Sequence, residues 1–279
     1  MRTIFLIDDY SPYSRNAAQF ALQVAEIIQA KILVGTFKVP VESSVTNLSG
    51  ASTKVTDLIE EEAIDDEHIS GQLKLLNSQR PHYDCRIEEM DISSMNVNLL
   101  AQFINTSNVT MLIKAAQCGL NNLSLARSFD MQTVLNQINV PVCLVPAGWK
   151  PSSFKSLAYL TDLRYCRTDI LSHLYQLTGS SITVYVAHMA IPGTADLSPN
   201  YAVDLFNDFS GRAPQKQPLF FHHIKQSASI TVADVLVNSM DTDALVLTNH
   251  SAHFKQLIGD DLSIRDPDVV NVPLLLYPA

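Results

Sequence analysis

Aspartates close the first apolar run in each half of this 279-residue chain. Asp8 and Asp9 follow the run 3–7, and Asp162 follows the run 157–161. Two interpretations stay open for Asp9 and Asp162. Each carboxylate can cap the turn or helix that follows it. Alternatively, it can line a ligand crevice, because the ligands of open parallel sheets bind beyond the carboxyl ends of the strands.

Histidine and cysteine offer further candidates. His250 and His253 have a spacing that lets one helical face present two imidazoles to a metal ion, but no third ligand is evident, and a polar surface loop is the simpler interpretation. His222 and His223 are adjacent in an expected strand, so their side chains point to opposite faces and cannot chelate one ion. Cys118 follows an expected strand and would be a redox-active thiol if a nearby helix N-terminus lowered its pKa, but an unreactive thiol is the simpler interpretation. We therefore predict no metal site.

Catalysis has no support in the sequence. The chain has no Gly-x-Ser-x-Gly motif, no Gly-x-x-x-x-Gly-Lys-Ser/Thr motif and no Gly-x-Gly-x-x-Gly motif. We name no catalytic residue.

Apolar runs alternate with amphipathic stretches along the chain and must position these side chains. Strands are expected at 3–7, 32–37, 85–90, 109–113, 142–145, 156–161, 181–187, 219–224, 243–248 and 273–277. Helices are expected near 13–29, 53–79, 95–106, 127–138, 166–178, 198–210 and 229–239. This alternation predicts an α/β fold with doubly wound, parallel sheets flanked by helices.

The chain also repeats itself at the spacing of a domain. Residues 139–147 and 271–279 are identical at six of nine positions, and the opening runs that end at Asp9 and Asp162 are similar. Such a period indicates duplication rather than a solenoid of short repeats. We predict two tandem domains, 1–148 and 153–279, joined by a short linker that contains Gly and Pro.

Composition excludes several classes of protein. Apolar residues make up 47% of the chain and charged residues 17%, which is typical of a globular protein. The net charge is −9 and neither half has a basic cluster, so we expect no nucleic-acid partner. No apolar run approaches the roughly 20 residues that a membrane helix needs, and the first residues do not form a signal peptide. The four widely spaced cysteines indicate the reduced thiols of a cytoplasmic protein.

The chain resembles the universal stress protein family. The similarity lies in the opening residues 7–22, in the segment 253–258, and in the two endings Val-Pro-Val-Cys-Leu-Val-Pro and Val-Pro-Leu-Leu-Leu-Tyr-Pro. The resemblance implies two fused domains with the adenine nucleotide alpha hydrolase-like fold, each a five-stranded parallel sheet between helices, and a stress-linked cytoplasmic role. It also implies that the final strands, 141–146 and 273–278, pair antiparallel, and that Asp9 and Asp162 face the nucleoside end of a ligand.

The sequence departs from the glycine-rich loop with which many members of this family bind ATP. At the places of the family's glycines stand Ala115, Cys118 and the pair Ser128-Phe129, although Gly119 is one residue away. A non-glycine residue forced to positive φ costs about 1–2 kcal/mol. In the second half the corresponding place holds Asp260-Asp261, whose charges would repel a polyphosphate. We therefore predict that neither half binds ATP in the usual family manner.

The expectation is a non-catalytic stress-response protein that acts in signalling or scaffolding, without a cofactor and with an unidentified protein partner or a second copy of itself. The alternative is a protein that binds, or slowly hydrolyses, ATP with Mg²⁺ through a phosphate loop rebuilt around Gly119 and Ser128. The candidate crevice residues are Asp8, Asp9, Ala115, Cys118, Gly119, Ser128, Asp162 and Thr248.

Overall fold

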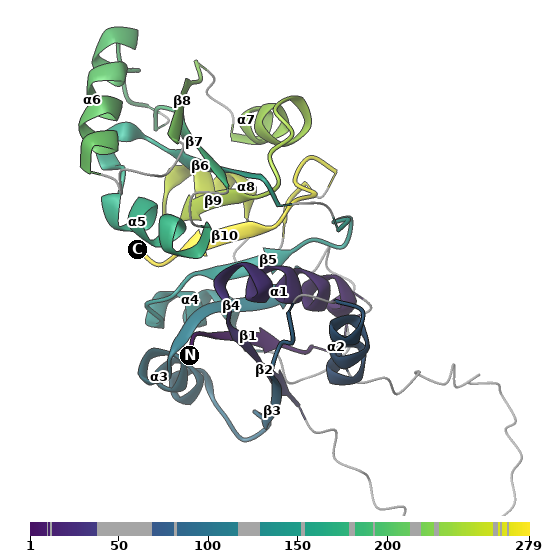
Figure 1. Cartoon of the computed structure of the whole chain (residues 1–279). Coiled ribbons are helices and arrows are strands. Elements are labelled where there is room, and N and C mark those ends of the chain that lie inside the picture. Colours follow the sequence, from purple (N-terminus) through teal and green to yellow (C-terminus); the bar gives the residue numbers. More distant parts are fainter. Residues whose placement is uncertain are drawn as a thin grey trace, which may run out of the picture.

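The structure is a computed structural model of the whole chain (Figure 1). It describes residues 1–9, 11, 13–37, 69–80, 83–116, 129–151, 154–178, 182–191, 193–212, 219–225, 229–258, 262, 264–266 and 268–279. Its strands are β1 (Thr3–Ile7), β2 (Lys31–Thr36), β3 (Ile87–Asp91), β4 (Val109–Ala115), β5 (Val142–Val145), β6 (Ser156–Thr161), β7 (Thr183–His188), β8 (Leu219–His223), β9 (Leu245–Thr248) and β10 (Leu274–Tyr277).

Helices connect most of these strands. They are α1 (Ser14–Ile28), α2 (Ile69–Ser78), α3 (Val97–Thr106), α4 (Met131–Gln137), α5 (Thr168–Thr178), α6 (Pro199–Arg212), α7 (Ser229–Asp234) and α8 (Ala252–Leu257). A 3₁₀ turn, η1 (Leu163–Tyr165), follows β6, and a π-helical turn, η2 (Val235–Ser239), continues α7. The predicted alternation of strands and helices is confirmed.

All ten strands form one sheet in the order β3-β2-β1-β4-β5-β10-β9-β6-β7-β8. The strand pairings are parallel except where β5 meets β10, which is antiparallel with Leu274 opposite Leu144 and Leu276 opposite Val142. Figure 1 shows these two strands at the centre of the molecule, with the remaining strands of each half extending to either side. The predicted α/β fold with a mostly parallel sheet is confirmed, and the two final strands join the halves into one sheet.

Two hydrophobic cores cover the two faces of this sheet, and each core contains residues from both halves. Alternation along β1 sends Ile4 and Leu6 to one core and Phe5 and Ile7 to the other. Buried residues of α1, α2, α5 and α6 complete the first core, and those of α3, α4, α7 and α8 complete the second. Because α1 also contacts α5, the halves share packing as well as backbone hydrogen bonds.

Of the helix expected over 53–79, the described residues contain Ile69–Ser78, and residues 53–68 lie outside the described part of the chain. Two local features differ from the sequence-based expectations. The helix expected over 229–239 changes to a π turn, in which the Met240 N–H donates to the Val235 carbonyl. The short elements η1 and α8 were not predicted, because neither is long enough to show a helical period.

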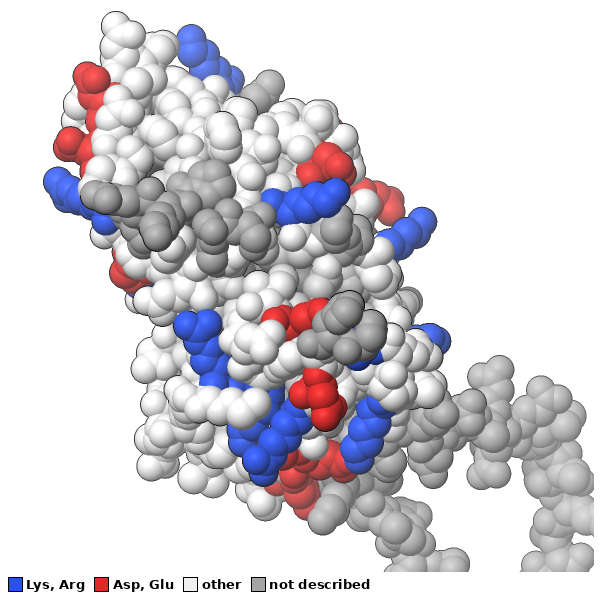
Figure 2. Space-filling model, viewed as in Figure 1, with Lys and Arg blue, Asp and Glu red and all other residues white. Residues whose placement is uncertain are grey.

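Among the described residues, no helix combines the length and the apolar character that crossing a membrane requires. On the face of the molecule in Figure 2, basic and acidic side chains lie interspersed. Several basic side chains of the first half form ion pairs with glutamates, for example Lys31 with Glu88 and Lys74 with Glu89.

The shared sheet predicts that the halves unfold together. Leu276 is fully buried opposite Val142, so Leu276→Ala should lower the free energy of unfolding by about 2–5 kcal/mol. Loss of circular dichroism should coincide with the change in fluorescence of Trp149, the single tryptophan, which packs edge-on against Phe20. The matched control is Leu99→Ala, because Leu99 is 49% exposed. Two well-separated transitions in the wild-type chain would contradict the prediction.

Candidate functional site

Each half has one place where the strand order reverses direction, and a carboxylate lies at each of them. In the first half β1 lies between β2 and β4, and in the second β6 lies between β7 and β9. Helices that leave such neighbouring strands cover opposite faces, which opens a crevice at the carboxyl ends of the strands. Asp9 follows β1 and Asp162 follows β6, so the structure places the two predicted aspartates at equivalent crevices.

In the first crevice Asp9 forms a buried ion pair. Its Oδ2 lies 2.9 Å from Lys114 Nζ of β4, and both side chains are less than 10% exposed. Its Oδ1 accepts hydrogen bonds from the backbone N–H of Ser11 at 3.1 Å and from the Ser14 hydroxyl at 2.9 Å. Burial raises the pKa of the Asp9 carboxyl, but the Lys114 charge and these hydrogen bonds outweigh it and hold the pKa below its ordinary value.

In the second crevice Asp162 is paired within its own turn. The Arg164 guanidinium donates to both carboxylate oxygens, at 2.9 Å from Nε and 2.6 Å from a terminal nitrogen. The backbone N–H groups of Arg164 and Ile191 also donate to Asp162. Burial raises the pKa of this carboxyl, but the hydrogen bonds from the Arg164 side chain and from the backbone outweigh burial and hold the pKa below its ordinary value. Asp162 is therefore ionised at neutral pH.

The source of the positive charge therefore distinguishes the two crevices. Register pairs Leu6 with Ile113 and Tyr159 with Val246, so Lys114 and Leu247 stand at equivalent positions in the fourth strand of each half. Lys114 crosses to its partner on the neighbouring strand and is 9% exposed, whereas the Arg164 side chain is 28% exposed. The cation of the first crevice is buried in the crevice floor, and that of the second lies at the rim.

The second crevice contains a cavity of about 510 Å³, which is within the range of small-molecule sites. Asp162 and Thr248, both predicted, line this cavity together. Its other lining residues are Leu160, Thr161, Tyr165, Ile191, Asn249, His250, Ser251, His253 and Lys255. Ser251 caps α8 by accepting a hydrogen bond from the Phe254 N–H, which fixes the turn that carries several of these residues.

His250 and His253, which the sequence offered as a metal-binding pair, direct their Nε2 atoms to different partners and not to a common metal ion. His250 Nε2 lies 3.0 Å from Asn136 Oδ1, and His253 Nε2 lies 3.1 Å from the Met189 carbonyl oxygen. Carbonyl and amide oxygens accept, so both Nε2 atoms carry a hydrogen and donate. His253 is also only 1% exposed, which corrects the expectation that it lies in a polar surface loop. Both histidines line the second cavity, a role that the sequence did not indicate, because their spacing suggested only a pair of metal ligands or a surface loop.

The remaining predicted residues fall into two groups. Asp8 and Ala115 are both buried, at the end of β1 and in the last position of β4. Cys118, Gly119 and Ser128 lie outside the described residues, as does the pair Asp260-Asp261. The role of these residues in ligand binding stays a prediction.

Three cysteine thiols are described, and burial suppresses their ionisation. Burial raises the pKa of Cys85 and of Cys143, and it raises that of Cys166 to about 12. Since the thiolate is the reactive form, these three side chains are structural.

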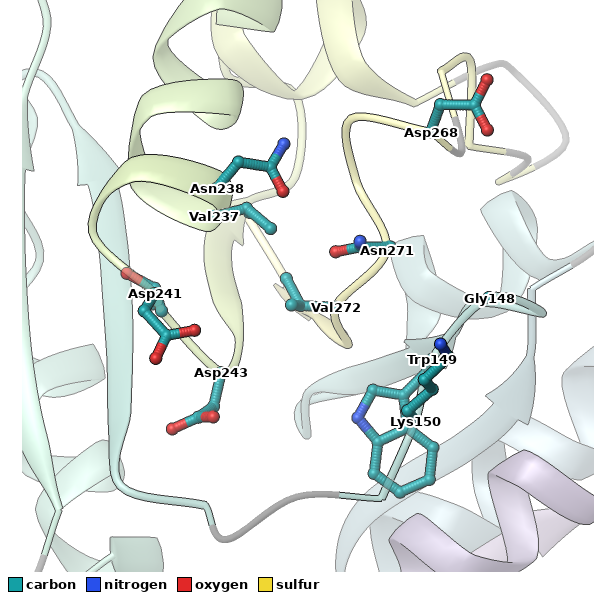
Figure 3. A pocket seen from close by; sticks show the side chains of 11 residues that line it. Gly148, Trp149, Lys150, Val237, Asn238, Asp241, Asp243, Asp268, Asn271 and Val272 are labelled. Carbon is teal, nitrogen blue, oxygen red and sulfur yellow. The ribbon is translucent and has the colours of Figure 1, made fainter.

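A second cavity, of about 490 Å³, lies at the junction of the halves. Figure 3 shows Asp241 and Asp243 on one side of it and the linker residues Trp149 and Lys150 on the other. Asp243 is already engaged, because its Oδ2 accepts from the backbone N–H groups of residues 155 and 156 at 2.7 and 2.9 Å. The Asp162 crevice is the stronger candidate site because it lies where the strand order reverses.

No protein-family model and no curated protein sequence matches this chain. Solved structures do match its fold. A universal stress protein from Archaeoglobus fulgidus DSM 4304 is 12% identical, with a TM-score of 0.56 over 99% of this chain and 95% of that one. The chain has the universal stress protein fold. A putative universal stress protein from Pseudomonas aeruginosa UCBPP-PA14 is also 12% identical, with a TM-score of 0.50 over 99% of this chain and 93% of that one.

The same universal stress protein fold matches a protein of another class. The cytoplasmic domain of a prokaryotic cation chloride cotransporter is 7% identical, with a TM-score of 0.51 over 99% of this chain and 95% of that one. Likeness at this level of identity establishes the architecture alone. The function must therefore be argued from the residues of the crevices.

The buried ion pair of the first crevice generates a stability prediction. Lys114→Met leaves the Asp9 carboxylate buried without its cation, which should lower the free energy of unfolding by about 3–5 kcal/mol near neutral pH. In the wild type the pair contributes stability above the ordinary carboxyl pKa and loses it as the pH falls through the lowered pKa of Asp9. In the variant only the hydrogen bonds from Ser11 and Ser14 oppose burial, so the pKa of Asp9 rises relative to the wild type and the difference between the two proteins should shrink as the pH falls toward roughly 4.

The measurement is urea unfolding of both proteins between neutral pH and pH 4. Lys74→Met is the matched control, because Lys74 and its partner Glu89 are largely exposed and their pair contributes at most about 1 kcal/mol. Adding Asp9→Asn to Lys114→Met should recover part of the loss. Equal destabilisation by both lysine substitutions, or a loss that does not depend on pH, would contradict the assignment.

Proposed function

We propose that this protein is a non-catalytic stress-response protein that acts in signalling or scaffolding, and that its second crevice binds a small ligand without a polyphosphate chain. The proposed domains are 1–148 and 153–279, as the sequence repeat indicates. The observation that carries the proposal is the difference between the cations of two crevices of the same architecture. Asp9 pairs with the buried Lys114, whereas Asp162 pairs with Arg164 at the rim.

The first crevice is unsuited to a nucleoside held by Asp9. Both oxygens of this carboxylate are engaged, one by Lys114 and the other by Ser11 and Ser14. Because the Asp9 and Lys114 side chains are both less than 10% exposed, a sugar hydroxyl would have to disturb this pair to reach the carboxylate, and a buried charge that loses its partner costs several kcal/mol. The carboxylate therefore serves as a structural anchor between β1 and β4 rather than as a ligand contact.

The second crevice is better suited to a ligand. Its cavity combines apolar walls, including Leu160 and Ile191, with a few polar groups that could set orientation, such as Thr248 and Lys255. The Asp162 charge is matched by Arg164, so a neutral ligand meets no unpaired charge at that point. The sequence places two further carboxylates, Asp260 and Asp261, after α8, which disfavours a triphosphate.

A signalling or scaffolding role fits a crevice whose shape depends on both halves. Asn136 of α4 accepts hydrogen bonds from the Asn249 amide at 2.8 Å and from His250 Nε2 at 3.0 Å. Both Asn249 and His250 line the second cavity, whereas α4 belongs to the first half. Occupancy of the crevice can therefore alter the packing between the halves, which is where a partner protein or a second copy would detect it.

The test is titration calorimetry with ATP and Mg²⁺, combined with native mass spectrometry of freshly purified protein. We expect no micromolar binding of ATP, because neither crevice offers both a free carboxylate and a glycine-rich phosphate loop. We expect a co-purifying small molecule that Thr248→Tyr removes by filling the cavity. Asn271→Tyr is the matched control, since Asn271 lines the other cavity.

Saturable micromolar binding of ATP would contradict the proposal and favour the alternative of a phosphate loop rebuilt around Gly119 and Ser128. A co-purifying molecule that survives Thr248→Tyr, or that Asn271→Tyr removes equally, would show that the second crevice is not the binding site. Hydrolysis of added ATP at a rate that follows protein concentration would contradict the non-catalytic assignment.

A further inference from the structure

Two histidines and an aspartate converge at the carboxyl ends of β7 and β8. His188 ends β7 and His223 ends β8, and the two are register partners on neighbouring parallel strands. Their side chains therefore leave the sheet on the same face, and their ring centroids are 5.0 Å apart. Asp196 comes from the segment between β7 and α6, and its carboxylate lies against both rings.

The distances within this cluster suit a metal ion. Asp196 Oδ1 lies 3.3 Å from His188 Nε2 and 3.1 Å from His223 Nε2, and one ligand atom from each residue lies within 4.8 Å of the other two. A tetrahedral ion with ligands at about 2.0–2.2 Å places its ligand atoms about 3.3–3.6 Å apart. The side chains would need only small rotations to reach that geometry.

A buried nitrogen without a hydrogen-bond partner is the second observation. His188 is 0% exposed, and its Nε2 forms no hydrogen bond even though Asp196 Oδ1 is 3.3 Å away. Buried polar atoms without partners are rare in native proteins and need an explanation. Around a tetrahedral ion the lone pair of each ligand atom points at the ion, about 35° away from the neighbouring ligand atom. The contact between His188 and Asp196 fits this arrangement, whereas His223 Nε2 donates to Asp196 in the metal-free protein.

We propose that His188 Nε2, His223 Nε2 and the Asp196 carboxylate form a binding site for a divalent transition-metal ion of the zinc type. Two imidazoles and one carboxylate supply three ligands, which leaves a position open for water or an exogenous group. The Asp196 side chain is 35% exposed and gives the ion a route from solvent.

Metal binding requires two rearrangements of hydrogen bonds. His223 Nε2 donates to the Asp196 carboxylate at 3.1 Å in the metal-free protein, so its hydrogen must move to Nδ1 before Nε2 can bind an ion. The second rearrangement concerns His188. The Leu163 backbone N–H donates to His188 Nδ1 at 3.2 Å, which places the ring hydrogen on Nε2 in the metal-free protein. When Nε2 binds the ion, this hydrogen moves to Nδ1, which must then release the Leu163 N–H and approach Asp162 Oδ1, now 4.0 Å away. A carboxylate that accepts from the second nitrogen of a metal-bound histidine is a common outer-shell arrangement.

The segment that carries Asp196 is already held in place. Arg164 donates to the Thr194 hydroxyl at 3.0 Å and to the Ala195 carbonyl at 3.1 Å, and Asp162 accepts from the Ile191 N–H. The same Asp162–Arg164 pair thus positions the metal-binding segment and forms the rim of the second crevice. The ion would therefore link the two sites through the η1 turn, independently of which small molecule the crevice accepts.

The experiment uses the full-length protein, stripped with a chelator and titrated with Zn²⁺ in competition with a chromophoric chelator. We expect one ion per chain. His223→Gln and Asp196→Asn should each weaken zinc binding by at least about 100-fold, because loss of an outer-shell partner alone costs about 10–100-fold. Co²⁺ as a second probe should give a visible absorption spectrum of low coordination number that both variants lose.

The controls are His222→Gln and His250→Gln. His222 is adjacent to His223 but points to the opposite face of the strand, and His250 belongs to the separate crevice. Both controls should keep full affinity for Zn²⁺. Absence of saturable zinc binding in the wild type, persistence of binding in both ligand variants, or equal loss in the controls would overturn the proposal. Circular dichroism of each variant distinguishes loss of a ligand from loss of the fold.

Discussion

The antiparallel pairing of β5 with β10 is the interaction on which the rest of this structure depends. Each of these strands is four residues long and fully buried, and each would be an apolar sheet edge if the halves were separate. Their pairing removes both edges and turns two five-stranded sheets into one of ten strands. It also aligns the two faces of the sheets, so that each hydrophobic core continues from one half into the other. The stability of either half is therefore inseparable from the junction.

This junction leaves the two crevices free to diverge. A crevice at a reversal of strand order needs only its own two central strands, and each half supplies a complete set. In the first half Lys114 neutralises Asp9 inside the crevice. In the second half Leu247 occupies the equivalent strand position, and Arg164, at the rim, neutralises Asp162 instead. One architecture thus holds two buried carboxylates, one paired with a buried lysine and the other with an arginine at the rim. The difference rests on a single substitution in the fourth strand and one arginine in a turn.

Much of the fold could be predicted from the sequence because buried parallel strands leave a strong signal. Every strand is largely or partly apolar and falls within about three residues of its expected position, and the repeated endings indicated which strands are equivalent. Asp9, Asp162 and Thr248 were predicted from their places at strand ends. Short elements such as η1 and α8 were not, because fewer than seven residues show no helical period.

The side-chain clusters were beyond the sequence for a different reason. The rule of alternating faces correctly separates His222 from His223, but it cannot say which residue of a neighbouring strand lies beside either of them. That depends on register, and only register brings His188, 35 residues earlier in the chain, opposite His223. Lys114 and Asp9 are likewise 105 residues apart and meet because β1 and β4 are neighbours. Ion pairs and ligand sets in a doubly wound sheet are products of strand order, so a single sequence identifies the side chains available but not the partners they find.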